Sequence, residues 1–507
     1  MPPPGPELLG TSPTGAGGAC AQPGEAGPTR LSGTSAGGAG GCPSGSSLRE
    51  ELRDDMKRQR KAVTAALTRR SVSGMGRSAD DDRRPALMEP FLATTTSTTA
   101  AAATAPSAAP PSLSTPAALA ALFLTPLNIL LLGLPLTLVA HARSWGPIPV
   151  FSLSFLSLIP LASLLAVLTE ELAAQVGDTA GGLLNATAGN IPELAVSISA
   201  LRRGLFDVVT TSLLGSITSN LLLVLGCCHV AGAIGPGGAA CAGRLARHGT
   251  LAVKAYSSML VLACAALAVP TATAHIPHDH LRPGGALAVS RGVSVLLLLM
   301  YAAFLVFSLG THARPLEVEA AAAAAASAAE AGGAAAVAAE EEEEEEEDLL
   351  HLPLPVALAC LLAVTAVVGL ASELLTGAIR GVAAAGVPQR LLSLIIIPVA
   401  ANATEHASSV IVAAKGKMDL AHSIALGSSL QVATFVMPAC VVAAWAMGIP
   451  FDLACDPLLF LLLLLSVLHQ QSVSADGRSD WLTGTQLICL YVIVAIPSAF
   501  MKVSPTT

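Results

Sequence analysis

The 507-residue sequence is poor in charge: only 12% of its residues are Asp, Glu, Lys or Arg, whereas 53% are apolar and the mean hydropathy is +0.65. Of the 62 charged residues, 22 lie in residues 1–92 and 13 in residues 312–351. The surface of a soluble protein of this size carries far more charge than the remainder supplies. The composition excludes a soluble enzyme and indicates a membrane protein with polar extensions.

Other scarcities narrow the class further. The ten cysteines include no CxxC pair, which disfavours a disulfide scaffold or a zinc site. The net charge of −8 and the lack of a broad basic face disfavour nucleic-acid binding. Nothing resembles a secretory signal, because the first apolar run begins only near Ala117.

Apolar stretches of about 17–25 residues, the length that spans a bilayer core, recur from Ala117 onward. We expect an all-α polytopic membrane protein. Its eleven predicted transmembrane helices lie near residues 118–140, 148–169, 180–201, 208–233, 250–270, 288–310, 352–379, 390–414, 420–447, 456–473 and 484–501.

Polar segments divide the chain into four parts. Residues 1–115 are predicted to be a disordered cytosolic tail, with a regulatory role left open for its basic stretch Leu48–Arg70. Residues 116–311 form the first transmembrane half and residues 352–503 the second. Between them, residues 312–351 form an acidic cytosolic linker with a run of eight glutamates, Glu340–Glu347.

The two halves share a sequence pattern. Helix 3 contains Gly189-Asn190-Ile191-Pro192-Glu193, and Gly215-Ser216 follows 22 residues after the glutamate. Helix 8 contains Ala401-Asn402-Ala403-Thr404-Glu405, and Gly427-Ser428 follows at the same distance. The offset is 212 residues at four positions. Four predicted helices lie between helix 3 and helix 8, so these two helices run in opposite directions, and we expect two inverted five-helix repeats with one additional N-terminal helix.

Each repeat places a carboxylate inside an apolar span, where a charge costs about 2.5–3.5 kcal/mol or more unless it is compensated. Gly189, Pro192 and Pro398 are expected to break helices 3 and 8 and so free backbone carbonyls. Carboxylate, amide and hydroxyl oxygens suit a hard divalent cation such as Ca²⁺. The predicted ligands are Glu193, Glu405, Asn190, Asn402, Ser216, Ser428 and Gln431.

The same carboxylates bind protons, so proton and metal compete for one site, which is the minimum requirement of antiport. Glu193 and Glu405 are therefore the predicted proton-coupling residues. His406, which has Leu194 at the equivalent position, is a further candidate as proton carrier.

The motifs resemble those of the Ca²⁺/H⁺ exchanger family of the cation/Ca²⁺ exchanger superfamily. The similar stretches are GGLLNATAGNIPELAVSISAL, GSITSNLLLVLG and IPVAANATEHASSVIVAAKGKMDLAHSIALGSSLQVATFVMP. The resemblance implies a vacuolar-membrane exchanger with an acidic cytosolic segment, whose site glutamates and histidine correspond to Glu193, Glu405 and His406. The sequence departs from the family pattern at Ala401 and at Ile191-Pro192, both beside the site.

We therefore expect an antiporter that exchanges cytosolic Ca²⁺ for lumenal protons. An exchanger of the same fold that prefers Mn²⁺ or uses Na⁺ remains open, as does a channel. An intramembrane hydrolase built on Glu405, His406 and a serine is disfavoured, since it needs no second glutamate and no HExxH motif is present. No cofactor is expected, and a homo-oligomer is left open.

Overall fold

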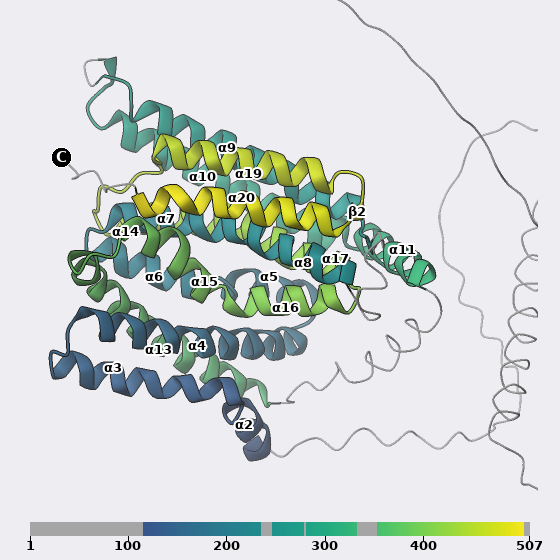
Figure 1. Cartoon of the computed structure of the whole chain (residues 1–507), viewed down its shortest axis with the longest axis horizontal. Helices are drawn as coiled ribbons and strands as arrows, with labels where there is room; N and C mark the ends of the chain where they lie inside the picture. Colours follow the sequence, from purple (N-terminus) through teal and green to yellow (C-terminus); the bar gives the residue numbers. More distant parts are fainter. Residues whose placement is uncertain (1–114, 235–245, 278–279, 332–351, 501–507) are drawn as a thin grey trace, which may run out of the picture. The chain divides into compact units, whose positions relative to one another are not determined.

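A computed structural model describes residues 115–234, 246–277, 280–331 and 352–500. Most of the predicted tail and the Glu340–Glu347 run lie outside these ranges. Within them the chain is a bundle of helices that lie alongside one another (Figure 1). Apolar residues along each helix and the absence of charge from most of its length suit lipid, where backbone groups must hydrogen-bond within the segment.

The first half contains η1 (Pro126–Leu132) with α3 (Gly133–Ala142), α4 (Pro147–Val176), α5 (Asp178–Ala188), α6 (Ile191–Arg202) and α9 (Thr250–Thr273). Between α6 and α9, α7 (Phe206–Thr218), η2 (Ser219–Val224) and α8 (Leu225–Ile234) form one continuous run. The helices α10 (Gly285–Val306), η5 (Phe307–Thr311) and α11 (Ala313–Ala331) complete it, and α2 (Thr115–Phe123) precedes it.

The second half repeats this order. It contains α13 (Leu354–Ala384), α14 (Gln389–Leu391), η6 (Leu392–Ile396), α15 (Ile397–Ala401), α16 (Ala403–Ala414), α17 (Met418–Gln431), η7 (Val432–Val436), α18 (Met437–Ala446), α19 (Pro457–Ser474) and α20 (Trp481–Phe500). The turn after α6 and the turn after α16 each use a glycine with positive φ, Gly204 (66°) and Gly416 (85°). These glycines are also 212 residues apart, so the repeat extends to the backbone of the turns.

Eight helical runs among the described residues are long and apolar enough to cross a membrane, and the bent pair Gln389–Ala401 and Ala403–Ala414 adds a ninth. The segment predicted as helix 1 is interrupted between α2 and η1, which leaves the shorter apolar helix Pro126–Ala142. The segment predicted as helix 3 is divided into α5 and α6. The protein is thus a polytopic helical membrane protein, and the count of eleven spans stays a prediction.

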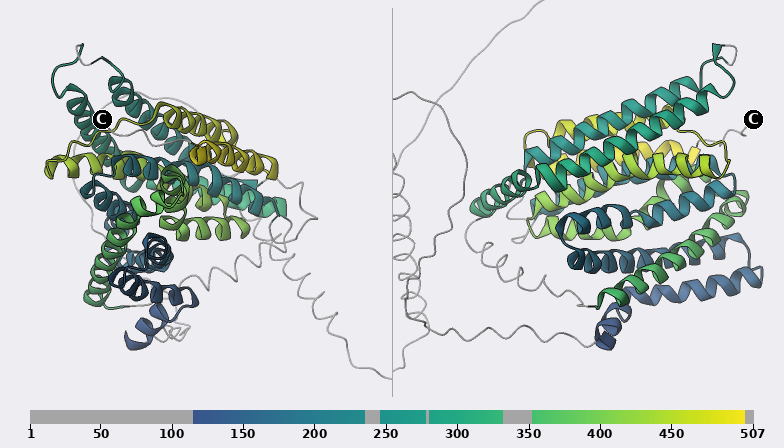
Figure 2. Two further views of the ribbon diagram at one scale, coloured as in Figure 1. Left: turned by 60° about the vertical axis from the view of Figure 1, so that its left-hand side comes forward. Right: turned by 180° about the vertical axis from the view of Figure 1, so that it is seen from behind.

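The two ends of the bundle differ. At one, here called the linker end, α11 lies beside a short antiparallel pairing of β1 (Ala246–Arg247) with β2 (Arg478–Ser479). At the other, here called the distal end, α14 lies near the start of α7 (Figures 1 and 2). The longest helices of the two halves, α4 and α13, pack against each other and join the halves.

Candidate functional site

Both repeats break a helix at the same asparagine. Asn190 lies between α5 and α6 with φ −95° and ψ 13°, and Asn402 lies between α15 and α16 with φ −101° and ψ 13°. The second break bends the segment by 60°. The break predicted near Gly189 and Pro192 is confirmed. The break predicted at Pro398 is wrong, because Pro398 lies inside the helical segment Gln389–Ala401, directly after the π-helical turn η6, and the bend follows at Asn402.

The breaks place both glutamates at helix N-termini. Glu193 and Glu405 are each the third residue of their helix, in the first turn of α6 and α16. There the unsatisfied N–H groups and the positive end of the helix dipole favour a negative charge inside the apolar bundle. One carboxylate oxygen of each glutamate, Oε2, is buried without a hydrogen-bond partner, and the two carboxylates are close enough for their charges to interact.

Amide and hydroxyl groups join the two repeats around these carboxylates. Asn190 Nδ2 donates to Gln431 Oε1 at 2.6 Å, and Asn220 Nδ2 donates to Ser428 Oγ at 2.9 Å. His406 Nε2 lies 3.0 Å from Asn220 Oδ1, an oxygen that only accepts, so this ring nitrogen carries the proton. Side-chain hydrogen bonds therefore join repeat 1 to repeat 2 at two places.

The network connects His406 with the carboxylate of its neighbour only indirectly. The side chains of Ser428 and Asn220 lie beside the Glu405 carboxylate. The path from the histidine ring to the carboxylate thus runs through Asn220, which contacts both. Asn220 was not among the predicted ligands, although it is an asparagine in an apolar run, which is a signal of function by itself.

The remaining predicted residues lie at the same level. Ser216 lines a small pocket together with Glu193, and Pro398 closes its other side. Asn402 is 1% exposed, and neither atom of its side-chain amide has a partner among the described residues. The structure thus places all eight predicted residues at the two helix breaks or on the runs that cross them, with Asn402 unconnected to the others.

Access to the two glutamates is unequal. A cavity of about 490 Å³ reaches Glu405, Ser428 and Gln431. It is also lined by Leu316 of α11, which belongs to the linker end. The pocket at Glu193 measures about 10 Å³, near the minimum for a single water. Among the described residues, the cavity at Glu405 is large enough for a hydrated ion, whereas the pocket at Glu193 is not.

A tight seam closes the distal side. Gly215 of α7 lies against the backbone of η6, where an added Cβ atom would stand 2.1 Å from the Leu394 oxygen and 2.7 Å from Pro398 Cγ. One turn earlier, Thr211 Oγ1 donates to Ser393 Oγ at 2.5 Å. At the equivalent Gly427 the nearest atom would be 3.8 Å away, on the ring of Tyr256. The same helix face is thus sealed in one repeat and open in the other.

The donor set suits a hard cation more than a soft one. The described residues contain no group of three or more His, Cys, Asp or Glu side chains placed to hold a metal. Two carboxylates must therefore be supplemented by amide, hydroxyl and backbone oxygens, the ligands that Ca²⁺ accepts. The unpartnered oxygens of Glu193 and Glu405 are available for that purpose, or for protons.

Two helical repeats of opposite orientation, each broken at a buried polar site, define a secondary transporter. The profile of the sodium/calcium exchanger protein family matches residues 147–310 and 356–499. The chain belongs to this family and, within it, to the Ca²⁺/H⁺ exchangers. It is thus a transporter rather than a catalytic enzyme.

Individual relatives support this placement. The chain is 38% identical over 373 residues to a Ca²⁺/H⁺ antiporter of Synechocystis, covering 73% of this chain and 96% of the relative. It is 36% identical to a vacuolar calcium ion transporter of Schizosaccharomyces pombe, covering 73% and 83%. The solved structure of native YfkE is 30% identical, with a TM-score of 0.58 and coverage of 74% of this chain and 100% of that one.

Proposed function

We propose that the protein exchanges cytosolic Ca²⁺ for lumenal protons at one site formed by Glu193 and Glu405. The observation that carries this proposal is the pair of buried carboxylates at the N-termini of two broken helices, only one of which opens to a large cavity. A relative named as a Ca²⁺/H⁺ antiporter that is 38% identical supports the choice of ions.

Protons and the metal displace each other at this site. With both carboxylates ionised, two negative charges hold a divalent cation, aided by Ser428, Gln431 and the asparagine amides. When the carboxylates take up protons, the charge that held the cation is removed and the cation leaves. His406 contacts Asn220, which lies beside the Glu405 carboxylate, so we assign it a role in proton coupling rather than in metal binding.

Alternating access follows from the inverted repeats. In the structure, the segment 389–398 seals the distal side against α7. The equivalent surfaces at the linker end, on α5 and α17, are separated, and Gly182, Ser423 and Gly427 line the cavity between them. We propose that closure of α5 onto α17 seals the linker end while segment 389–398 leaves α7.

The linker end is assigned to the cytosol. Lys415 and Lys417 lie in the turn before α17, and Arg478 lies in β2, all at this end. Basic residues accumulate on the cytosolic side of membrane proteins. At the distal end, Arg202 and Arg203 depart from this rule. Both form ion pairs with Glu373 of the other half, at 3.2 and 2.8 Å.

The membrane and the stoichiometry are parts of the same proposal. Fungal and plant relatives are named as vacuolar transporters, which favours the vacuolar membrane. A pH difference of 2 units provides about 2.7 kcal/mol per proton. A 10⁴-fold Ca²⁺ gradient costs about 5.5 kcal/mol, and each charge moved against 100 mV costs about 2.3 kcal/mol more. One proton per Ca²⁺ is insufficient under such gradients, and about three suffice.

The test is ⁴⁵Ca²⁺ uptake into proteoliposomes with an acidic lumen, comparing the wild type with Glu193→Gln and Glu405→Gln. We expect uptake that requires the pH gradient, collapses with a protonophore and is lost in both variants. If Mn²⁺ or Na⁺ moves in place of Ca²⁺, the proposed ion is wrong, but the proposed exchange mechanism stands. Uptake that survives Glu193→Gln contradicts the shared site, and uptake without a gradient indicates a channel.

A further inference from the structure

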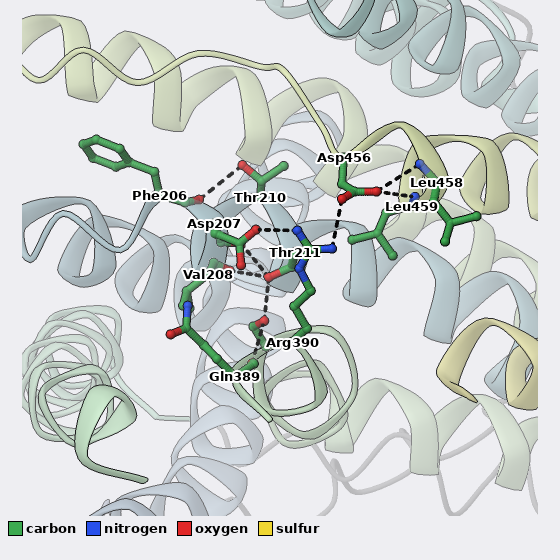
Figure 3. A network of polar contacts seen from close by, with 11 residues as sticks. Phe206, Asp207, Val208, Thr210, Thr211, Gln389, Arg390, Asp456, Leu458 and Leu459 are labelled. Carbon is green, nitrogen blue, oxygen red and sulfur yellow. Dashed lines mark hydrogen bonds and ion pairs between the residues drawn. The ribbon is translucent and has the colours of Figure 1, made fainter. Parts of the chain in front are cut away.

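One buried guanidinium ties together three elements at the distal end. Arg390 of α14 is 5% exposed. Its Nη1 donates to Asp456 Oδ2 at 2.9 Å, and its Nη2 lies 3.5 Å from Asp207 Oδ1 (Figure 3). Asp456 also caps α19 by accepting from the backbone N–H groups of Leu458 and Leu459.

Arg390 lies at the start of the segment that seals the distal side. Along this segment, Arg390 faces Asp207, Ser393 meets Thr211, and Leu394 with Pro398 covers Gly215. The α7 partners recur every four residues and so occupy one face of that helix. The ion pair of Arg390 with Asp207 is therefore the outermost of these contacts, and movement of segment 389–398 away from α7 breaks it.

The first repeat carries the opposite charge at the matching position. Subtracting the offset of 212 from Arg390 gives Asp178, the first residue of α5, and adding it to Asp207 gives Asp419 of α17. Closure of α5 onto α17 by the mirrored motion brings the start of α5 toward the start of α17. The second repeat has an arginine at the position where the first repeat has an aspartate.

The surroundings of the two acidic positions are otherwise alike. Asp419 accepts a hydrogen bond from the Gly249 N–H at the start of α9. Glu319 of α11 caps the same helix by accepting from the N–H groups of Thr250 and Leu251, at 2.9 Å each. Glu319 thus does for α9 what Asp456 does for α19. The two repeats differ at the position of Arg390, where the first repeat has Asp178.

We propose that Arg390 is a positioning residue of the exchanger, a latch that holds the distal side closed and biases the resting protein toward the state open at the linker end. It acts on the ion site through segment 389–398 and does not touch the site carboxylates. The assignment rests on the proposed alternating access, and its test reads conformation rather than transport.

The test measures the labelling rate of reporter cysteines with a membrane-impermeant thiol reagent. Ser212→Cys, on the wall of the Glu193 pocket, reports distal opening, and Ser308→Cys, on the wall of the large cavity, reports opening at the linker end. The side chains of the two aspartates that bind Arg390 are about a quarter exposed. Water therefore screens these ion pairs, and we expect a smaller effect on the conformational equilibrium than from a fully buried pair. In Arg390→Gln we expect Ser212→Cys labelling to rise about tenfold and Ser308→Cys labelling to fall.

Matched variants separate a latch from a merely structural arginine. Arg380→Gln is the control, because Arg380 lies at the same end but is exposed and, among the described residues, donates to the Arg203 carbonyl rather than to a carboxylate. It should leave both rates unchanged. Arg390→Lys keeps the positive charge, so its labelling rates should be close to those of the wild type. This variant can still be measured if Arg390→Gln does not fold. Unchanged rates in a folded Arg390→Gln protein, with the thermal stability of the wild type, overturn the proposal.

The inverse experiment adds the latch where it is missing. Asp178→Arg puts an arginine at the position equivalent to Arg390, so we expect slower Ser308→Cys labelling, with the original rate restored by adding Asp419→Asn. An unchanged rate in Asp178→Arg contradicts the charge asymmetry. Labelling requires neither Ca²⁺ nor a pH gradient, so it tests the role of Arg390 separately from transport. If labelling shifts as expected but the protein moves no Ca²⁺, the proposed transport function is wrong and the role of Arg390 stands.

Discussion

Replacing either of two equivalent glycines with alanine should slow exchange while trapping the protein in opposite states. At Gly215 the new Cβ would stand 2.1 Å from the Leu394 oxygen, and ordinary contact begins at 3.4 Å. The seam must therefore widen by roughly 1.3 Å, and the obstructing atom is backbone, so no side-chain rotation relieves it. Overpacking of this kind costs about 1–3 kcal/mol, which shifts a two-state equilibrium about 5- to 150-fold away from the sealed distal side.

Gly427→Ala should have the opposite effect. In the described state its Cβ meets nothing closer than 3.8 Å, so the variant folds without strain. Closure of the linker end then brings α5 against this position, and the methyl group obstructs it as it would at Gly215. We expect the cavity side to stay open and turnover to fall, although no contact in the present structure is lost.

The assay is the pair of reporter cysteines at Ser212 and Ser308, together with ⁴⁵Ca²⁺ uptake. Gly215→Ala should label faster at Ser212→Cys, and Gly427→Ala should label faster at Ser308→Cys. Gly369→Ala, on α13 with no atom within 4 Å of its added Cβ, is the control and should resemble the wild type. Normal turnover in Gly427→Ala would refute closure of α5 onto α17.

Three further predictions concern individual side chains. Asn220→Ala should reduce turnover and alter its pH dependence as His406→Ala does, and the double variant should be no worse than Asn220→Ala, because the histidine acts through the asparagine. Burial lowers the pKa of His248, whose Nε2 faces the Ser474 carbonyl at 3.3 Å. As the pH falls, His248 therefore takes up a proton in the unfolded chain before it does so in the folded protein. Below about pH 6.5 the unfolding free energy of the wild type should decrease by at most about 1.4 kcal/mol per pH unit. The Tm of His248→Gln should depend less on pH. Glu373→Gln should lower the unfolding free energy by less than about 1 kcal/mol and leave uptake intact, because its ion pairs with Arg202 and Arg203 are exposed; a loss of uptake would place Glu373 on the ion path.

The sequence was sufficient to predict the class of fold and the first helix break, because a buried carboxylate and a fixed offset are visible without coordinates. It misplaced the second break at Pro398, which lies within the helical segment Gln389–Ala401, and the chain bends at Asn402 instead. It also left out Asn220. The position equivalent to Asn220 is Val432, so a search for matched pairs discards it.

The open and closed sides were beyond the reach of the sequence. Gly215 and Gly427 are equivalent in the chain, yet one touches backbone and the other faces a cavity. Two copies of one pattern in two conformations are what alternating access requires, and only coordinates show which copy is closed. The charge difference between Arg390 and Asp178 is visible in the sequence. Its effect on the two ends of the bundle can be inferred only from the contacts between segment 389–398 and α7.

The central claim is that Ca²⁺ and protons use one site with two glutamates. The most direct measurement records ⁴⁵Ca²⁺ uptake and proton efflux in the same proteoliposomes, the latter with a trapped pH dye. The account predicts more than one proton released for each Ca²⁺ taken up, and the loss of both fluxes together in Glu193→Gln and in Glu405→Gln. Ca²⁺ uptake without proton release, or coupled exchange that persists in either variant, would contradict it.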